Sequence, residues 1–134
     1  MSLTESCFAL VIASVAMAIT TPSLIRARET YVLNSAAHDV ASRMYAARVA
    51  AITRNRDCRL RVTSTTSYAI ECQGASWETI DSAALPGGIT VSANARPEFH
   101  RRGNVAPTAT VTLRNSVGES MRVIVNINGR VRIQ

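Results

Sequence analysis

Residues 1–25 read MSLTESCFALVIASVAMAITTPSLI, an apolar stretch with one acid near its start, Glu5, and one proline near its end, Pro22. An ionised carboxylate in hydrocarbon costs several kcal/mol, so an acid inside a membrane segment is by default functional and has a partner. The nearest unpaired cation is a chain amine. If the chain begins at Met1, the amine of a neighbouring copy can sit against Glu5 when subunits stack. That pair would set the axial register of the subunits.

An ordinary signal peptide or anchor is the competing interpretation of this stretch. A secretory signal has a basic region before its apolar run and a small-residue cleavage site after it. Here Glu5 comes before the apolar run, and Arg26 and Arg28 follow it. The order of charges therefore favours a membrane segment that stays on the chain.

The same stretch resembles the N-terminal segment of type IV pilins and type II secretion pseudopilins. In these proteins a prepilin peptidase cuts after a glycine, and the mature chain starts with a methylated Phe or Met and carries an acid at its fifth residue. Met1 and Glu5 fit that pattern, and Pro22 stands where many members have a helix-weakening proline. The resemblance implies the processed form of a single-pass inner-membrane protein. It would assemble with copies of itself and other pilins into a helical filament.

Helical periodicity continues after Pro22. From Ser23 to about Arg56, apolar residues recur at steps of three and four, and most of them are small. They are Leu33, Ala37, Val40, Met44, Ala47 and Ala51. A helix from about residue 2 to residue 54 would be roughly 80 Å long. Because proline lacks an amide hydrogen and crowds the preceding turn, we expect a kink or a melted turn near Pro22.

The chain divides into a hydrophobic segment, residues 1–25, and a periplasmic or extracellular part, residues 26–134. The latter has room for one small domain and not for two. The periodicity and the strand signals below predict an α+β fold. In it, the long helix packs on antiparallel β-sheets built from hairpins.

Residues 58–72 predict a disulfide-linked hairpin, because their two halves mirror each other about Thr65. A three-residue loop there pairs Cys58 with Cys72 on one face and Arg59 with Glu71 on the other. Closing a loop of about 15 residues contributes roughly 3 kcal/mol in the chain-entropy model. The disulfide indicates an oxidising compartment.

A metal pair or two free buried thiols is the alternative for these two cysteines. No histidine lies near them in sequence to complete a zinc set. The third cysteine, Cys7, is interpreted as a small apolar residue of the membrane segment.

Residues 73–88 have little periodicity and are interpreted as a connecting loop or short irregular strands. Strand signals return at residues 89–93, 108–113 and 121–133. In the last of these, a three-residue loop with Gly129 left-handed aligns Val125 with Val131. The outward face then carries Arg122, Arg130 and Arg132.

The stretch Phe99-His-Arg-Arg-Gly103 and the ending Gly129-Arg-Val-Arg132 together resemble the GspH/FimT branch of minor pilins and pseudopilins. Competence-associated members of that branch are thought to bind DNA through a C-terminal Gly-Arg-x-Arg segment, which maps onto Arg130 and Arg132. Two residues on one strand face are about 7 Å apart, close to the spacing of successive phosphates. The alternative is that these arginines solvate the sheet edge or contact a neighbouring subunit, and relatives in secretion systems can also end in a Gly-Arg turn.

Composition narrows the function further. All 15 basic residues are arginine and the formal charge is +6. Arginine grips carboxylate or phosphate bidentately, although genome base composition could produce the same bias. Aromatic residues make up only 4%, which argues against a base-stacking platform. There is no Gly-rich phosphate loop or metal-ligand spacing, and neither His38 nor His100 stands beside a nucleophile, so we expect neither enzyme activity nor a cofactor.

Overall fold

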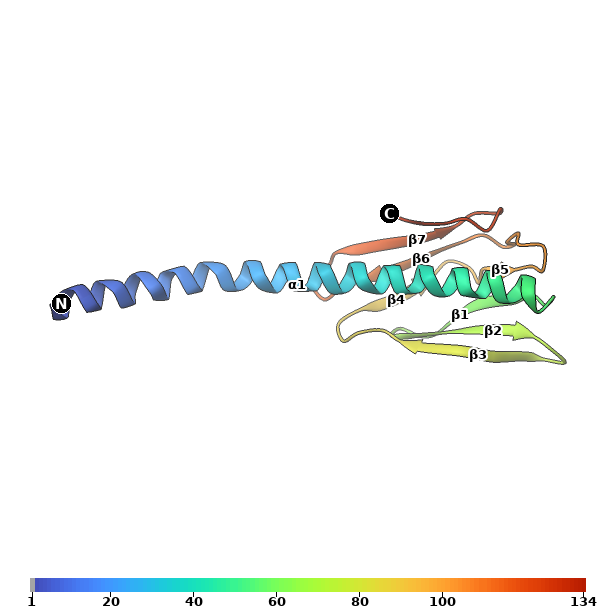
Figure 1. The fold of residues 1–134 in the computed structure, drawn as a ribbon, viewed down its shortest axis with the longest axis horizontal. Helices are drawn as coiled ribbons and strands as arrows, with labels where there is room; N and C mark the ends of the chain where they lie inside the picture. The colour runs from blue at the N-terminus through green and yellow to red at the C-terminus, as the bar shows by residue number, and fades with distance from the viewer. Residues whose placement is uncertain (1) are drawn as a thin grey trace.

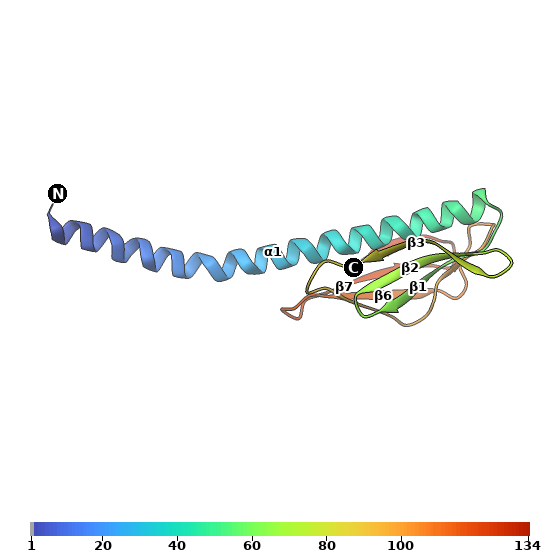
Figure 2. The same ribbon diagram turned by 90° about the horizontal axis from the view of Figure 1, so that it is seen from below.

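The computed structural model describes residues 2–134, and its described part consists of one helix and eight strands (Figure 1). The helix, α1, spans Leu3–Thr53. Its N-terminal part projects far beyond the sheets, and its C-terminal part lies across them (Figures 1 and 2). The predicted α+β fold with a long helix packed on antiparallel sheets is confirmed.

Pro22 lies inside α1, and the helix continues through it without a break. Figure 2 shows a gradual curve of the helix axis in place of the predicted kink or melted turn. Hydroxyl groups nearby bond to carbonyls of the preceding turn, with Thr21 Oγ1 donating to the Met17 carbonyl at 2.7 Å. The missing amide hydrogen of Pro22 thus bends the helix over several turns and does not end it. Unwinding at this point in a filament stays a prediction.

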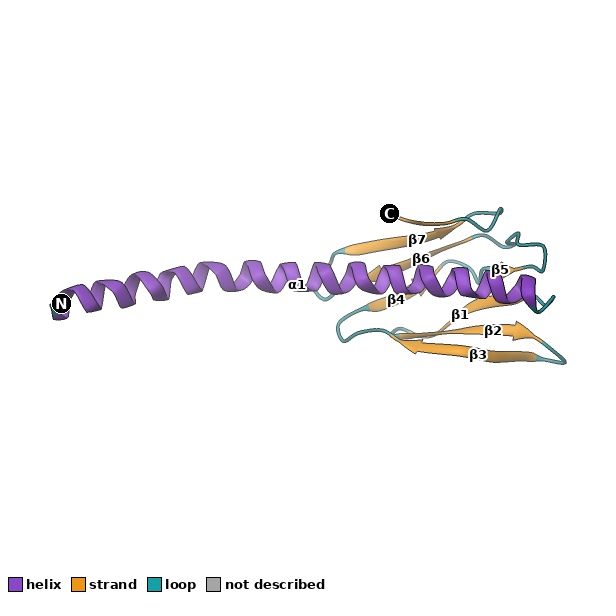
Figure 3. Cartoon of the chain, viewed as in Figure 1, coloured by secondary structure: helices purple, strands orange, loops and turns teal. Residues whose placement is uncertain are grey.

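The strands form two four-stranded antiparallel sheets, coloured orange in Figure 3. Sheet A has the order β3-β2-β1-β5, with bounds β1 Cys58–Ser64, β2 Ser67–Gln73, β3 Trp77–Ala84 and β5 Glu98–Phe99. Sheet B has the order β4-β6-β7-β8, with bounds β4 Thr90–Ala93, β6 Ala109–Arg114, β7 Ser120–Val125 and β8 Val131–Ile133. As predicted, the sheets are built from consecutive hairpins, β1-β2-β3 in sheet A and β6-β7-β8 in sheet B. Strands β5 and β4 are added at the edges of sheets A and B, respectively.

The core lies between α1 and the two sheets. All six residues of the predicted apolar stripe are buried, beginning with Leu33 and ending with Ala51. Small residues on the stripe let the helix lie close to the strands. Side chains from both sheets complete the core, among them Leu60, Phe99, Val111, Val123 and Val125. No residue between Ser2 and Val32 is fully buried.

The β1–β2 hairpin has the predicted register except at its tip. Cys58 pairs with Cys72 and Arg59 with Glu71. The loop is shorter than predicted, however, because Ser64 pairs with Ser67 and the register shifts between Val62 and Ser64. A bulge at this point takes up the extra residue, so the loop has two residues instead of three.

The β7–β8 hairpin has the predicted register and loop. Val125 pairs with Val131 and Val123 with Ile133. Gly129 has φ 78°, in the left-handed region that favours glycine, and its N–H donates to the Asn126 carbonyl at 2.8 Å. The predicted three-residue loop is confirmed.

Of the two interpretations of residues 73–88, a connecting loop or short irregular strands, the strand holds in the centre, where β3 spans Trp77–Ala84. This strand lies at the edge of sheet A and most of its residues are exposed, so it has no apolar alternation to reveal it. Its register with β2 holds it in place, and the Arg59 guanidinium lies 4.0 Å above the Trp77 ring centre.

A polar cluster joins α1 to sheet A. Arg43 on α1 pairs with Asp81 on β3 and with Asp39 one turn earlier, at 3.1 Å in the second case. The Tyr68 hydroxyl donates to Asp39 Oδ2 at 2.9 Å. Burial raises the pKa of Tyr68, and the hydrogen bond to Asp39 raises it further. The helix is thus fixed to the exposed edge of the sheet as well as to the core.

Candidate functional site

The N-terminal half of α1 presents apolar side chains to solvent on all sides. The segment is long and apolar enough to cross a membrane, and none of that stretch is buried against the rest of the chain. Leu3, Phe8 and Met17 are each at least 70% exposed. A monomeric soluble protein rarely leaves so large an apolar surface uncovered, so this segment requires a lipid or protein partner.

Glu5 lies at the third position of α1 and completes a capping box with Ser2. The Ser2 N–H donates to Glu5 Oε2 at 3.1 Å, and the Glu5 N–H donates to Ser2 Oγ at 3.4 Å. This local role was missed from the sequence, although Ser-x-x-Glu is its known signature. A carboxylate has two oxygens, and among residues 2–134 no donor contacts Oε1 of Glu5, which can accept a further one. Met1, the predicted partner in assembly, lies outside the described residues.

The Cys58–Cys72 disulfide is formed, with the two Cα atoms 4.0 Å apart. On the opposite face of this hairpin, Glu71 is buried between two arginines. Arg59 Nη2 lies 2.8 Å and Arg61 Nη1 lies 3.3 Å from its carboxylate oxygens. The bridged hairpin is therefore a rigid support for the neighbouring β5.

The predicted binding arginines lie exposed on one face of the β7–β8 hairpin. Arg122 and Arg132 are diagonal neighbours on the two strands. Arg132 is opposite Ile124, and the Arg122 N–H donates to the Gln134 carbonyl at 2.8 Å. Arg130 follows the turn and pairs with Asn126. Within residues 2–134, none of these three guanidinium groups makes an ion pair or a side-chain hydrogen bond. Their charge is therefore available to a partner.

A second basic segment lies beside this hairpin. The loop 100–105 packs on the turn 127–129, because the Val105 N–H donates to the Ile127 carbonyl at 2.8 Å. Arg48 on α1 joins them, with Nε donating to the Gly103 carbonyl at 3.0 Å. The two motifs that carried the sequence resemblance thus meet at one end of the molecule, which could not be read from either motif alone.

We call the resulting surface the arginine surface. It consists of five exposed arginines from the loop and the hairpin: Arg101, Arg102, Arg122, Arg130 and Arg132. From residue 99 to the C-terminus there are six arginines and one acid, Glu119, so this stretch carries +5 of the chain's formal +6. The four strands of sheet B contain no carboxylate. Charge is thus concentrated on one part of the fold.

The two histidines are not part of the arginine surface. His38 is exposed on α1, with Nδ1 2.9 Å from the Asn34 carbonyl. His100 is half-buried beside Asp57, with Nδ1 3.4 Å from Asp57 Oδ2. Its carboxylate neighbours, Asp57 and Glu98, were not predicted, because Asp57 is remote in the sequence and Glu98 lies on a two-residue strand without a strand signal.

Comparison with solved structures supports the fold. The minor pseudopilin EpsH of the Vibrio cholerae type 2 secretion system has a TM-score of 0.67 and 17% identity, over 76% of this chain and 95% of that chain. The Pseudomonas aeruginosa type IV minor pilin FimU has a TM-score of 0.66 and 15% identity, over 79% of this chain and 90% of that chain. No curated protein sequence matches the chain.

The sequence-family model described as type II transport protein GspH matches residues 36–129. The match covers most of the buried part of α1, all of sheet A and three of the four strands of sheet B, and it ends just before Arg130. The family match therefore includes Gly129 but neither Arg130 nor Arg132, so the role of these two arginines has to be argued from their surroundings in the structure. With its long helix, its two hairpin sheets and this match, the chain belongs to the GspH family of pilin-like proteins.

Proposed function

We propose that this chain is a structural subunit of a type IV pilus or a type II secretion pseudopilus, anchored in the inner membrane before assembly. A prepilin peptidase would process it, and residues 26–134 would face the periplasm. The observation that carries the proposal is the division of α1. Its first turns expose apolar residues on every side, whereas the first fully buried residue is Leu33. Residues 1–25 would lie in lipid before assembly and in a bundle of helices afterwards.

In this proposal Glu5 fixes the position of each subunit along the filament. Its Oε2 already accepts the Ser2 N–H, so Oε1 would accept a cationic donor from a neighbouring copy. The chain amine is that donor when Met1 is the first residue of the mature protein. The cost of a lone carboxylate in an apolar bundle would favour the one register that supplies this donor.

Two substitutions at Glu5 separate its roles in capping and in pairing. Glutamine can complete a capping box as glutamate does, but it carries no charge. We therefore expect both Glu5→Gln and Glu5→Ala to remain in the membrane fraction and to be absent from sheared filaments. If Glu5→Gln assembles as the parent does and only Glu5→Ala fails, the acid serves the helix cap and the pairing role is wrong.

A second candidate function is DNA binding during natural transformation, through the arginine surface. Its support is the absence of acidic partners for Arg122, Arg130 and Arg132 in the described chain, in contrast to the paired Arg43 and Arg59 on sheet A's side. Exposed guanidinium groups at strand spacing can contact successive phosphates. Such binding would depend on salt and not on sequence.

Fluorescence anisotropy with duplex DNA tests this candidate. Replacing Arg130 and Arg132 by alanine should lower affinity and reduce the salt slope by about two phosphate contacts, roughly 1.8 in log–log units. The matched control replaces Arg28 on α1 and Arg96 between β4 and β5, which are also exposed and make no ion pair within the described residues but lie outside the arginine surface. If both double variants lose the same affinity for DNA, binding follows the net charge of the chain, and a defined DNA-binding surface is refuted.

A gene deletion distinguishes a pilus subunit from a subunit of a secretion pseudopilus. Deleting the gene should abolish surface filaments or DNA uptake in the first case and export of folded proteins in the second. If the deletion leaves all three processes unchanged, neither form of the proposed function holds.

A further inference from the structure

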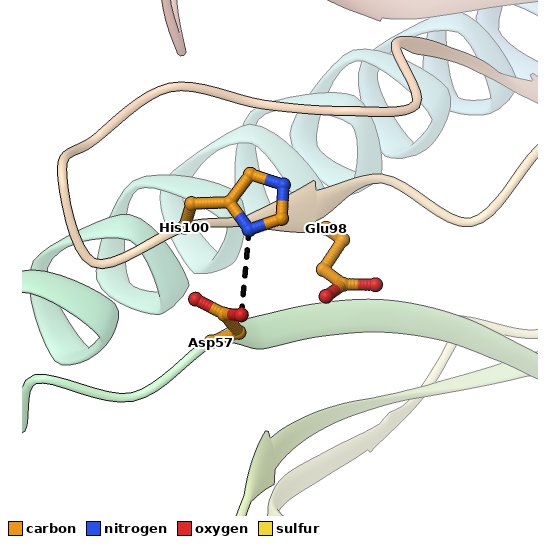
Figure 4. A group of neighbouring side chains, drawn as sticks. All are labelled: Asp57, Glu98 and His100. Carbon is orange, nitrogen blue, oxygen red and sulfur yellow. Dashed lines mark ion pairs between the residues drawn. The ribbon is translucent and has the colours of Figure 1, made fainter.

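Three metal-ligand side chains converge where β5 runs beside β1 (Figure 4). Asp57 directly precedes β1, Glu98 begins β5 and His100 follows it. One donor atom from each lies within 4.8 Å of the others, and all three residues are partly buried. We propose that Asp57, Glu98 and His100 bind one Zn²⁺ ion.

Glu98 is the residue that an ordinary ion pair does not explain. In the antiparallel register its partner on β1 is Arg59, a cation that could neutralise it. Arg59 is committed elsewhere, because its Nη2 lies 2.8 Å from Glu71 and its guanidinium stacks on Trp77. Among the residues described, the Glu98 carboxylate has no hydrogen bond and no ion pair. Two carboxylates this close repel each other unless a cation lies between them.

The donor set and its spacing suit zinc. Tetrahedral Zn²⁺ with bonds of about 2.0–2.1 Å holds its ligand atoms about 3.3 Å apart, and His100 Nδ1 and Asp57 Oδ2 are 3.4 Å apart. One imidazole nitrogen with two carboxylates favours Zn²⁺ over Ca²⁺, which takes oxygen ligands. Two carboxylates also balance the ion's charge. A water molecule would fill the fourth position.

Main-chain contacts hold Asp57 in position for this role. The Arg101 N–H donates to Asp57 Oδ1 at 3.3 Å, which leaves Oδ2 directed at His100. The Asp57 carbonyl accepts the Gln73 N–H at 2.8 Å, so the residue is fixed to β2. Outer contacts of this kind orient metal ligands.

The ion would tie the segment after α1 to β5 and to the loop 100–105. That loop carries Arg101 and Arg102 and packs on the turn 127–129. Zinc binding would therefore order the loop that carries two of the five arginines of the arginine surface, without contacting their guanidinium groups. The proposal stands independently of what that surface binds.

Isothermal titration of the full chain in detergent micelles with Zn²⁺ tests the site, with Cys7→Ser as the background because Cys7 is an exposed free thiol. We expect one Zn²⁺ per chain and a large preference over Ca²⁺. Glu98→Gln should weaken binding at least about tenfold, by the scale known for lost metal-site contacts. The matched control is Glu78→Gln on β3, an exposed glutamate outside the triad, which should bind as the background does.

His100→Gln gives a second, independent variant and should also lose at least tenfold in affinity. Trp77 fluorescence of the metal-free variants verifies that each one is folded. The site is refuted if Zn²⁺ does not saturate at one ion per chain, if Ca²⁺ competes equally, or if folded Glu98→Gln binds zinc as tightly as the control.

Discussion

Replacing Gly129 by alanine tests whether the β7–β8 turn is locked to the loop 100–105. Gly129 has φ 78°, and a Cβ at this position would meet the Gly103 carbonyl oxygen directly. It would also come within 2.7 Å of Arg48 Nε, which is itself bonded to that carbonyl. Helix α1, the loop 100–105 and the turn 127–129 therefore meet at Gly129, with no room for a methyl group.

The expected cost has two separable parts. A left-handed conformation costs an L-residue about 1–2 kcal/mol relative to glycine. Overpacking against groups that cannot move adds about 1–3 kcal/mol. Gly118 provides the matched control, because it has φ 88° and an added Cβ there would meet nothing within 4 Å. Gly118→Ala should show the first cost alone, and Gly129→Ala should show both.

Urea unfolding of a fragment from residue 28 to residue 134, followed by Trp77 fluorescence, measures the difference. This fragment keeps the whole core, since the first buried residue is Leu33. With a slope of about 2 kcal/mol per molar urea, the Gly129→Ala midpoint should lie about 0.5–1.5 M below that of Gly118→Ala. Coinciding midpoints would mean that the turn yields freely and that the close contact with Gly103 does not restrain it.

Three further predictions concern sheet A. Replacing Cys58 and Cys72 by alanine should lower the free energy of unfolding by about 3 kcal/mol, as measured by urea unfolding against the disulfide-bonded parent. Glu71→Gln should cost about 3 kcal/mol in the same assay, because it leaves two arginines beside a neutral buried side chain. Tyr68 has a raised pKa because of burial and its bond to Asp39, so its contribution is present below pH about 10 and is lost as pH rises further. Tyr68→Phe should therefore remove part of the loss of stability above pH about 10, and an unchanged alkaline slope would contradict this.

Sequence periodicity predicted the elements whose faces differ in polarity. The stripe from Leu33 to Ala51 and the register of the β7–β8 hairpin followed from alternation of apolar and polar residues. Such patterns are local, and burial of one face enforces them. Strand β3 could not be told from a connecting loop, because both of its faces are largely exposed and only its ladder with β2 defines it.

Contacts between distant segments were not predictable from those patterns. Asp57 and His100 are brought together by the pairing of β1 with β5, a strand of two residues with no strand signal of its own. The packing of the loop 100–105 on the turn 127–129 likewise depends on two main-chain groups, the Val105 N–H and the Ile127 carbonyl. Backbone contacts of this kind leave no trace in side-chain periodicity, and they determine where the charged residues meet.

The Gly-Arg-Val-Arg segment therefore contains two kinds of residue that should be judged separately. Gly129 is required by the fold, because its position beside the Gly103 carbonyl excludes any side chain. Arg130 and Arg132 are exposed and make no ion pair or side-chain hydrogen bond within the described chain, so their replacement should change stability by no more than about 0.5 kcal/mol. A DNA-binding defect in the double arginine variant at unchanged stability would thus identify a contact surface. The same defect in Gly129→Ala would report only a displaced turn, so the glycine by itself is evidence for the fold and not for DNA binding.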